Sequence, residues 1–114
     1  MTPGRRALGA RGESLTARWY EQHGYRVVSR NWRCREGEID LVLVHGRTVV
    51  VCEVKTRTSN AFGSPYEAVT PAKQRRLRIL ALRWLQAHEI TGVPLRFDVA
   101  GVIGDEVSVI EAAF

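Results

Sequence analysis

Two stretches decide the fold: Gly-Glu-Ile-Asp at 37–40, and Val-Cys-Glu-Val-Lys-Thr-Arg at 51–57. Each lies in an apolar, valine-rich run of the length and composition of a buried β-strand. A short turn at 45–47 separates the two runs, which predicts an antiparallel hairpin. Nevertheless, each run contains an acid, Asp40 in the first and Glu53 in the second.

The two acids need a partner, because burying an unpaired carboxylate costs several kcal/mol. Side chains two apart on a strand share a face, so Glu53 and Lys55 point the same way and Val54 points opposite. One solution is an ion pair between either acid and Lys55 at the end of the sheet. The other is a divalent-metal site, since two carboxylates, waters and a substrate phosphate suit Mg²⁺. In that case Lys55 orients the attacking water or neutralises charge on the scissile phosphate.

The register of the hairpin decides whether Asp40 and Glu53 can bind one metal ion, because directly opposed residues share a face of the sheet. If Val44 pairs with Val49, Asp40 falls opposite Glu53. If Val44 pairs with Thr48, Asp40 lands opposite a cysteine and Glu53 points to the other face. The metal site requires the first register, or a bulge that restores it.

The rest of the chain alternates between helical and extended patterns. We expect a helix over 8–23 that ends at Gly24, and a strand over 25–32. The close spacing of Gly9 and Gly12 inside that helix indicates close packing or a nearby ligand. Two more strands are expected over 95–102 and 107–110.

A second helix is expected to begin with Thr70 as its cap and Pro71 at its first position. Gly92 and Pro94 are expected to end it. Its predicted buried stripe is Leu77, Leu80, Ala81, Trp84 and His88. The order α-β-β-β-α-β-β predicts an α/β fold, a mixed central sheet with flanking helices, in one domain spanning 1–114.

Charge favours a nucleic-acid partner. The 17 basic residues outnumber the 12 acidic ones, the net charge is +5 and the pI is about 9.9. Eight arginines crowd the first 35 residues, and an arginine-rich basic surface is typical of phosphate binding, although a merely solvated face is the alternative. The candidate phosphate contacts are Arg11, Arg33, Arg35, Arg57, Lys73 and Arg76.

Several classes of protein are excluded or disfavoured. No uncharged apolar run approaches the ~20 residues that cross a bilayer, and no signal-peptide pattern is evident, so we expect a cytoplasmic protein without a membrane partner. Cys34 and Cys52 have no CxxC spacing, and the histidines form no HxH or HExxH pattern, which disfavours a zinc hydrolase. Neither a Walker A run nor a G-x-S-x-G elbow is present.

The acid on one strand and the E-x-K on the next resemble the signature of the PD-(D/E)xK nuclease superfamily. More narrowly, Gly9-x-x-Gly12-Glu13, Asn-Trp-Arg at 31–33, Gly-Glu-Ile-Asp, Glu-Val-Lys-Thr-Arg and the stretch 69–77 resemble the YraN-like family (uncharacterised protein family 0102). That bacterial family is similar in fold to archaeal Holliday-junction resolvases. The resemblance implies an αβββαβ restriction-endonuclease-like core.

The resemblance also implies site residues and a cofactor, Mg²⁺ or Mn²⁺. It places Asp40 and Glu53 as metal ligands, with the carbonyl of Val54 as a third, and Lys55 as the catalytic lysine. Glu13 matches an acid that some superfamily members contribute from the first helix. Gln74 matches a polar residue that related nucleases carry on the second helix. Ile39 stands where the named motif has proline, and apolar residues there are common in the superfamily.

The function expected from these observations is metal-dependent cleavage of phosphodiester bonds in structured or branched DNA. Relatives that cleave junctions usually act as symmetric dimers, so a homodimer is expected. The loop over 57–66, with Phe62 and Tyr66, is expected to cover or guide the substrate strand. Two alternatives stay open: a nucleic-acid-binding module of the same fold without turnover, and a partner-docking domain whose acids are simply paired.

Overall fold

The computed structural model describes residues 5–58 and 65–114. The elements follow the predicted order, with one short 3₁₀ helix, η2, added before the second long helix. They are α1 (Arg5–Gln22), β1 (Arg26–Cys34), β2 (Gly37–His45), β3 (Thr48–Arg57), η2 (Pro65–Ala68), α2 (Pro71–Ala87), β4 (Leu95–Ile103) and β5 (Glu106–Ile110). Phe62 lies outside the described residues, so its expected contact with substrate stays a prediction. In the described part of the chain, no helix combines the length and the apolar character needed to span a membrane.

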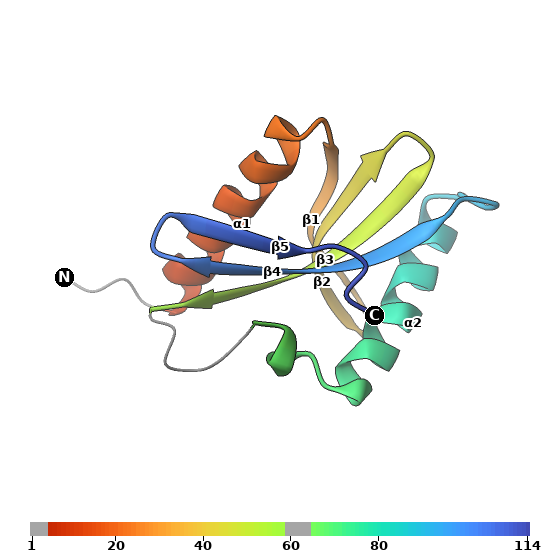
Figure 1. Cartoon of the computed structure of the whole chain (residues 1–114). Coiled ribbons are helices and arrows are strands. Elements are labelled where there is room, and N and C mark those ends of the chain that lie inside the picture. The colour runs from red at the N-terminus through yellow and green to blue at the C-terminus, as the bar shows by residue number, and fades with distance from the viewer. Residues whose placement is uncertain (1–4, 59–64) are drawn as a thin grey trace.

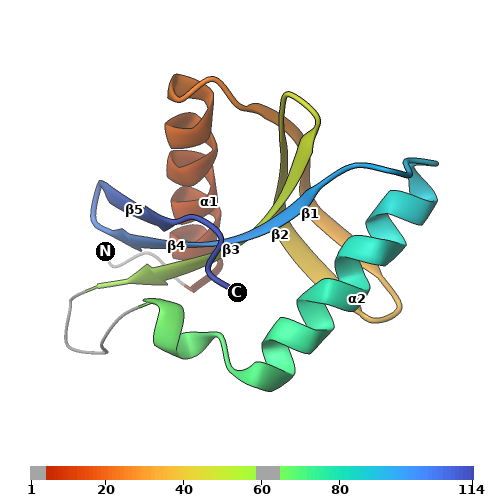
Figure 2. The same ribbon diagram turned by 45° about the vertical axis from the view of Figure 1, so that its right-hand side comes forward.

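A mixed five-stranded sheet forms the centre of the molecule, in the order β1-β2-β3-β4-β5. β3 and β4 run parallel, and the other neighbouring pairs run antiparallel. The α2 connection between β3 and β4 makes their parallel pairing possible, since parallel neighbours need a long crossover. Figures 1 and 2 show α1 and α2 on opposite sides of the sheet. The predicted α/β class and αβββαβ order are confirmed, and the arrangement is consistent with a restriction-endonuclease-like core.

The β2–β3 hairpin adopts the register that the metal site requires. Val44 pairs with Val49, and the ladder continues to Leu41 opposite Cys52. One step further along the same register, Asp40 comes opposite Glu53. The alternative register, in which the two acids would lie on opposite faces of the sheet, is therefore excluded.

Each face of the sheet has its own apolar core. On the α2 side, Leu80 and Trp84 pack against Val51 and Val99. On the α1 side, Tyr20 packs against Leu41 and other strand residues. Because both faces of β2 and β3 are covered, their continuous apolar runs are accounted for. Cys52 is buried in the α1-side core as a free thiol, as expected for a structural cysteine.

Gly12 explains how closely α1 approaches the sheet. A Cβ built at this position would lie 2.1 Å from Oγ1 of Thr56 on β3. A side chain at this position fits only if Thr56, the helix or the strand shifts. The close packing that the sequence predicted for Gly12 is therefore confirmed, and the adjacent residue, Glu13, is brought next to the sheet by the same approach.

The helix α2 begins as predicted and ends earlier. Thr70 is the N-cap, its Oγ1 accepting from the backbone nitrogen of Lys73, and Pro71 follows. The predicted end at Gly92 is wrong, because Glu89 adopts a left-handed φ of 55° and stops the helix after Ala87. His88 is thus a C-cap residue, exposed and stacked on Trp84, so its assignment to the buried stripe is also wrong.

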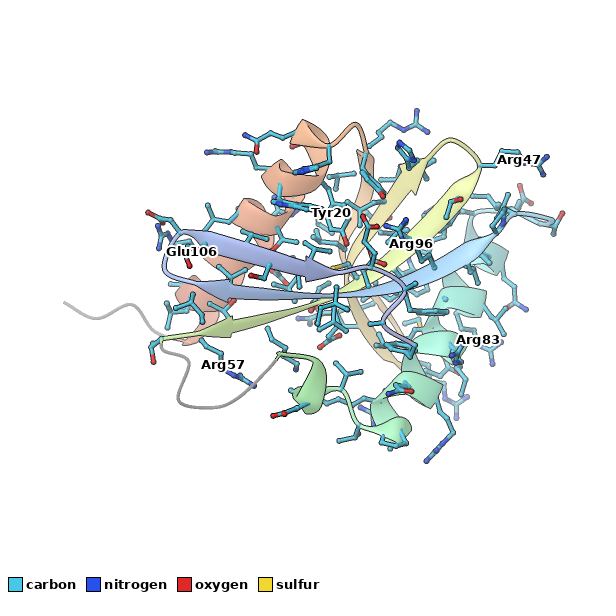
Figure 3. The ribbon with its side chains drawn as sticks, in the orientation of Figure 1. Tyr20, Arg47, Arg57, Arg83, Arg96 and Glu106 are labelled. Atoms are coloured by element: carbon cyan, nitrogen blue, oxygen red, sulfur yellow. The ribbon has the colours of Figure 1, made fainter. Side chains whose placement is uncertain are left out.

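A buried carboxylate joins the C-terminal strands to α1. Asp98 on β4 is 1% exposed and accepts a hydrogen bond of 2.6 Å from the hydroxyl of Tyr20. Arg96 donates to both of its oxygens, at 2.9 and 2.8 Å, and the backbone nitrogen of Ala112 donates at 3.0 Å. Figure 3 labels Tyr20 on α1 and Arg96 on β4. With four donated bonds this charge is fully satisfied, as a structural ion pair must be.

Candidate functional site

The site begins where the β2–β3 ladder ends. The last backbone pair of the ladder is Leu41 with Cys52. Beyond it, Oδ2 of Asp40 accepts a hydrogen bond of 2.8 Å from the backbone nitrogen of Val54. In an extended strand the N–H and C=O of one residue point to the same edge, so the Val54 carbonyl faces this edge of β3 too. The geometry is thus compatible with the predicted contribution of Val54 as a carbonyl ligand.

Three acids converge at this point. Carboxylate oxygens of Glu13, Glu38 and Asp40 all lie within 4.8 Å of one another. Glu13 comes from α1, and the other two come from β2. The sequence prediction that the first helix supplies an acid near Asp40 is therefore matched by the geometry.

Glu53 stands beside this group on β3 and interacts with Lys55. Its Oε1 lies 3.2 Å from the Lys55 ammonium nitrogen, and both side chains are about four-fifths buried, with exposures of 17% and 18%. The two residues share a face of the strand, as their spacing predicted. Lys55 thus reaches the acidic cluster through Glu53.

The pKa of Asp40 reflects the crowding of negative charge. Burial, with the charge of Glu53 next, raises it to about 7, against the lowering effect of the Val54 hydrogen bond. Burial also raises the pKa of Glu13, while hydrogen bonds with Asn31 and Asp40 oppose the shift. Strongly perturbed carboxylates in one cluster are typical of functional sites.

A second lysine adjoins the first. Lys73, on the first turn of α2, forms a hydrogen bond with Lys55, and this bond together with burial lowers the pKa of Lys73. Burial alone would lower the pKa of Lys55 as well, but the bond with Lys73 and the charge of Glu53 outweigh it and raise that pKa. Lys55 therefore holds its proton more tightly than Lys73 does.

A pocket of about 210 Å³ opens between β2, β3 and α2. Its lining includes Glu38 and Glu53 from the sheet, and Lys73, Arg76 and the apolar Leu80 from α2. Acidic and basic groups therefore border the same small space. Such a pocket can receive a phosphate against the cations while the acids stay available for a metal ion.

The predicted phosphate contacts are scattered over several elements. Arg33 pairs with Glu38 at 3.1 Å, and Arg11 pairs with Asp105. Arg35 is exposed in the β1–β2 turn, and Arg57 ends β3, where Figure 3 shows it at the edge of the molecule. Only Lys73 and Arg76 of the six line the pocket next to the acids.

The side chain of Gln74, in the first turn of α2, forms a hydrogen bond with the backbone. Its amide nitrogen donates to the carbonyl of Val69 at 3.2 Å. This bond closes the turn between η2 and α2, so a direct part of Gln74 in the site stays a prediction.

Sequence reasoning missed two members of the cluster. It did not count Glu38 of the Gly-Glu-Ile-Asp motif among the metal ligands, whereas the carboxylate of Glu38 lies with those of Glu13 and Asp40. It assigned no task to Asn31, whose amide nitrogen, turned toward the acids, donates to Glu13 and Glu38. The signal for Glu38 was its place two residues before Asp40 in a strand that bends here. The signal for Asn31 was a polar, turn-favouring residue inside a strand pattern.

Comparisons with known proteins agree with one another. The family model described as "Uncharacterised protein family UPF0102" matches residues 12–102. A UPF0102 protein of Clavibacter michiganensis is 55% identical over 84% of this chain and 81% of its own length. A UPF0102 protein of Beutenbergia cavernae is 54% identical over 85% and 82%, and one of a Nocardioides species is 50% identical over 87% and 80%.

Proposed function

The chain belongs to the Uncharacterised protein family UPF0102, and we propose that it is a divalent-cation-dependent endonuclease that cleaves phosphodiester bonds in structured or branched DNA. The observation that carries the proposal is the convergence of Glu13, Glu38 and Asp40, with Glu53 and Lys55 beside them, at a pocket that Lys73 and Arg76 also line. Membership in the family confirms the YraN-like resemblance. Both the cleavage activity and the DNA substrate are inferences from that site.

The donor set fits Mg²⁺ or Mn²⁺. Carboxylate oxygens, with the Val54 carbonyl at the same edge, are hard ligands of the kind these cations prefer. Burial, and next the charge of Glu53, raises the pKa of Asp40, so a bound cation would stabilise its ionised form. Asp40 and Glu53 would hold the ion, with Glu13 and Glu38 close enough to share it or to bind its waters.

The residues of the chain then have distinct tasks. A bound divalent cation supplies Lewis-acid stabilisation of the phosphate and a lower pKa for coordinated water. Lys55, kept protonated by Glu53, presents an ammonium group that can orient the attacking water or stabilise the charge that develops on the phosphate. Lys73 and Arg76 hold the phosphate of the bound strand from the α2 side of the pocket.

DNA as the partner is supported by charge. The net charge of +5 and the preponderance of arginine favour a polyanion, and the cations beside the pocket place part of this charge next to the acids. The preference for branched DNA and the homodimer follow from the resemblance to junction resolvases. A dimer would present two such sites to the two strands that such an enzyme cuts.

Cleavage assays with matched variants test the proposal. The purified chain is incubated with duplex, flap and four-way-junction DNA in Mg²⁺, Mn²⁺ or EDTA, and binding is measured in parallel. We expect cation-dependent cleavage that falls at least ~100-fold in Glu53→Gln and Lys55→Ala, while DNA binding survives. Glu106→Gln on β5 and Arg47→Ala in the β2–β3 turn change residues that neither line the pocket nor belong to the acid cluster, so they serve as controls and should cleave normally.

The outcome also separates this function from a pure binding module. If the unmodified chain binds these DNAs but cuts none of them with either cation, the proposed nuclease activity is wrong and the fold serves binding. If Glu106→Gln loses activity as fully as Glu53→Gln, the assigned site is wrong.

A further inference from the structure

Asn31 occupies an unusual backbone position in the strand next to the acids. Its neighbours Arg30 and Trp32 pair with Leu41 and Ile39 on β2, so Asn31 lies opposite Asp40. Its φ is 51°, in the left-handed region that strand residues rarely enter. Asparagine tolerates this conformation better than other residues with a side chain, and glycine tolerates it best. The backbone therefore explains why a β-branched residue is absent, but not why asparagine stands here rather than glycine.

The hydrogen bonds of the Asn31 side chain explain why asparagine stands here. With its amide turned so that the nitrogen faces the acids, Asn31 donates to Oε1 of Glu38 at 2.9 Å. The same nitrogen lies 2.9 and 3.2 Å from the two carboxylate oxygens of Glu13. One amide thus joins an acid from α1 to an acid from β2, although these carboxylates repel each other.

A neutral donor suits this place better than a charged one. An arginine or lysine could hold two carboxylates together more strongly, but its own charge would oppose the entry of a cation. Arg33 and Arg30 do influence the cluster, the first through its ion pair with Glu38 and the second through its charge on Glu13, but both side chains are exposed. The contact shared by both acids is the uncharged amide.

We propose that Asn31 is a positioning residue of the cation site, holding Glu13 and Glu38 in their converged arrangement before a cation enters. The inference rests on the proposed function, because it assumes that the acids receive a divalent ion. It adds a residue and a task that the strand signature does not contain. The closest physical parallel is a hydrogen-bonded neighbour that orients a metal ligand, whose loss typically weakens metal affinity 10–100-fold.

The substitution Asn31→Gly isolates the amide, since glycine keeps the left-handed backbone and removes only the side chain. Calorimetric titration of the whole chain with Mn²⁺ should show affinity reduced about 10-fold or more in this variant. Arg26→Ala, an exposed change on the same strand, should leave the affinity within twofold of the unmodified chain. Affinity within twofold in Asn31→Gly as well would overturn the inference.

A second measurement needs no metal. In EDTA, urea midpoints are compared for Asn31→Gly, Glu13→Ala and the double variant. If the amide holds Glu13, the effect of Asn31→Gly should shrink once Glu13 is gone, and additive midpoint shifts would contradict the contact. Different results contradict the two proposals. If the unmodified chain takes up no Mn²⁺, the proposed cation site itself is wrong. An unmodified chain that binds Mn²⁺, with Asn31→Gly binding equally well, defeats only the task of Asn31.

Discussion

Asp40 accepts a hydrogen bond from the backbone of Val54, 2.8 Å from nitrogen to Oδ2, at the point where the β2–β3 ladder ends. The carboxylate therefore completes the hairpin and belongs to the acidic cluster at the same time. The fold buries this carboxylate and places it beside Glu53, and these two effects, burial first, raise the pKa of Asp40. Stability and cation binding should consequently be coupled through this one residue.

The pKa of Asp40 predicts how stability depends on pH. The folded protein raises this pKa from 3.8 to about 7, so it binds the proton more tightly than the unfolded chain does. Between these two pH values the metal-free protein should lose stability as pH rises, since the proton must leave a site that disfavours the charge. Thermal unfolding in EDTA at pH 5 and pH 8 measures the loss, which Asp40→Asn should reduce. A loss of the same size in the unmodified chain and in Asp40→Asn would show that Asp40 does not cause it.

Gly12 and Gly9 form a matched pair on one helix. Gly12→Ala should destabilise the protein by ~1–3 kcal/mol, because its Cβ would overlap Oγ1 of Thr56. Gly9→Ala meets nothing within 4 Å and should stabilise by up to ~1 kcal/mol through helix propensity. Urea denaturation of the two variants measures both effects. Equal effects of the two substitutions would contradict the close approach of α1 to β3.

The buried network around Asp98 should contribute strongly to stability. Tyr20→Phe removes a hydroxyl that donates to a buried charge at 2.6 Å, and we expect a loss of ~1.5–3 kcal/mol. The nearby Tyr25→Phe removes a hydroxyl that accepts from Arg96 at the protein surface and should cost less. Chemical denaturation of the two variants at one pH compares them. A smaller loss in Tyr20→Phe than in Tyr25→Phe would be inconsistent with the burial of Asp98.

The basic side of the pocket predicts the salt dependence of DNA binding. Arg76→Ala and Lys73→Ala should each weaken binding, and Arg76→Ala should lower the slope of log affinity against log salt by about 1, as expected for one lost phosphate contact. Arg47→Ala is the control, since Arg47 bonds the carbonyl of Gly92 away from the pocket. Fluorescence anisotropy at several salt concentrations measures the slopes. Equal slopes for Arg76→Ala and Arg47→Ala would argue against phosphate binding at α2.

The pattern in the sequence was sufficient for the order of the elements, and it left two hairpin registers between which the structure decides. Apolar runs, a turn and two interrupting acids predicted the α/β order, and the pairing of Val44 with Val49 selected the arrangement in which Asp40 and Glu53 can meet. The expectation of close packing holds for Gly12, whereas Gly9 in the same helix meets nothing within 4 Å and has no packing reason.

Other features depend on tertiary structure and could not be predicted from local pattern. Asn31 adopts a left-handed conformation within β1, and its amide lies within reach of Glu13 from α1 and Glu38 from β2, an arrangement that needs both the strand pairing and the approach of α1. The end of α2 was misplaced because Glu89, not a glycine, takes the left-handed position. The acid cluster thus contains residues that no spacing rule singles out.

The central claim is that one divalent cation binds among the acids at the end of the β2–β3 ladder. A crystal of the chain soaked in Mn²⁺ and measured at the manganese absorption edge tests it most directly. We predict one strong anomalous peak within bonding distance of carboxylate oxygens of Asp40 and Glu53, lost in crystals of Glu53→Gln. A soaked crystal with no anomalous peak at these carboxylates would contradict the claim.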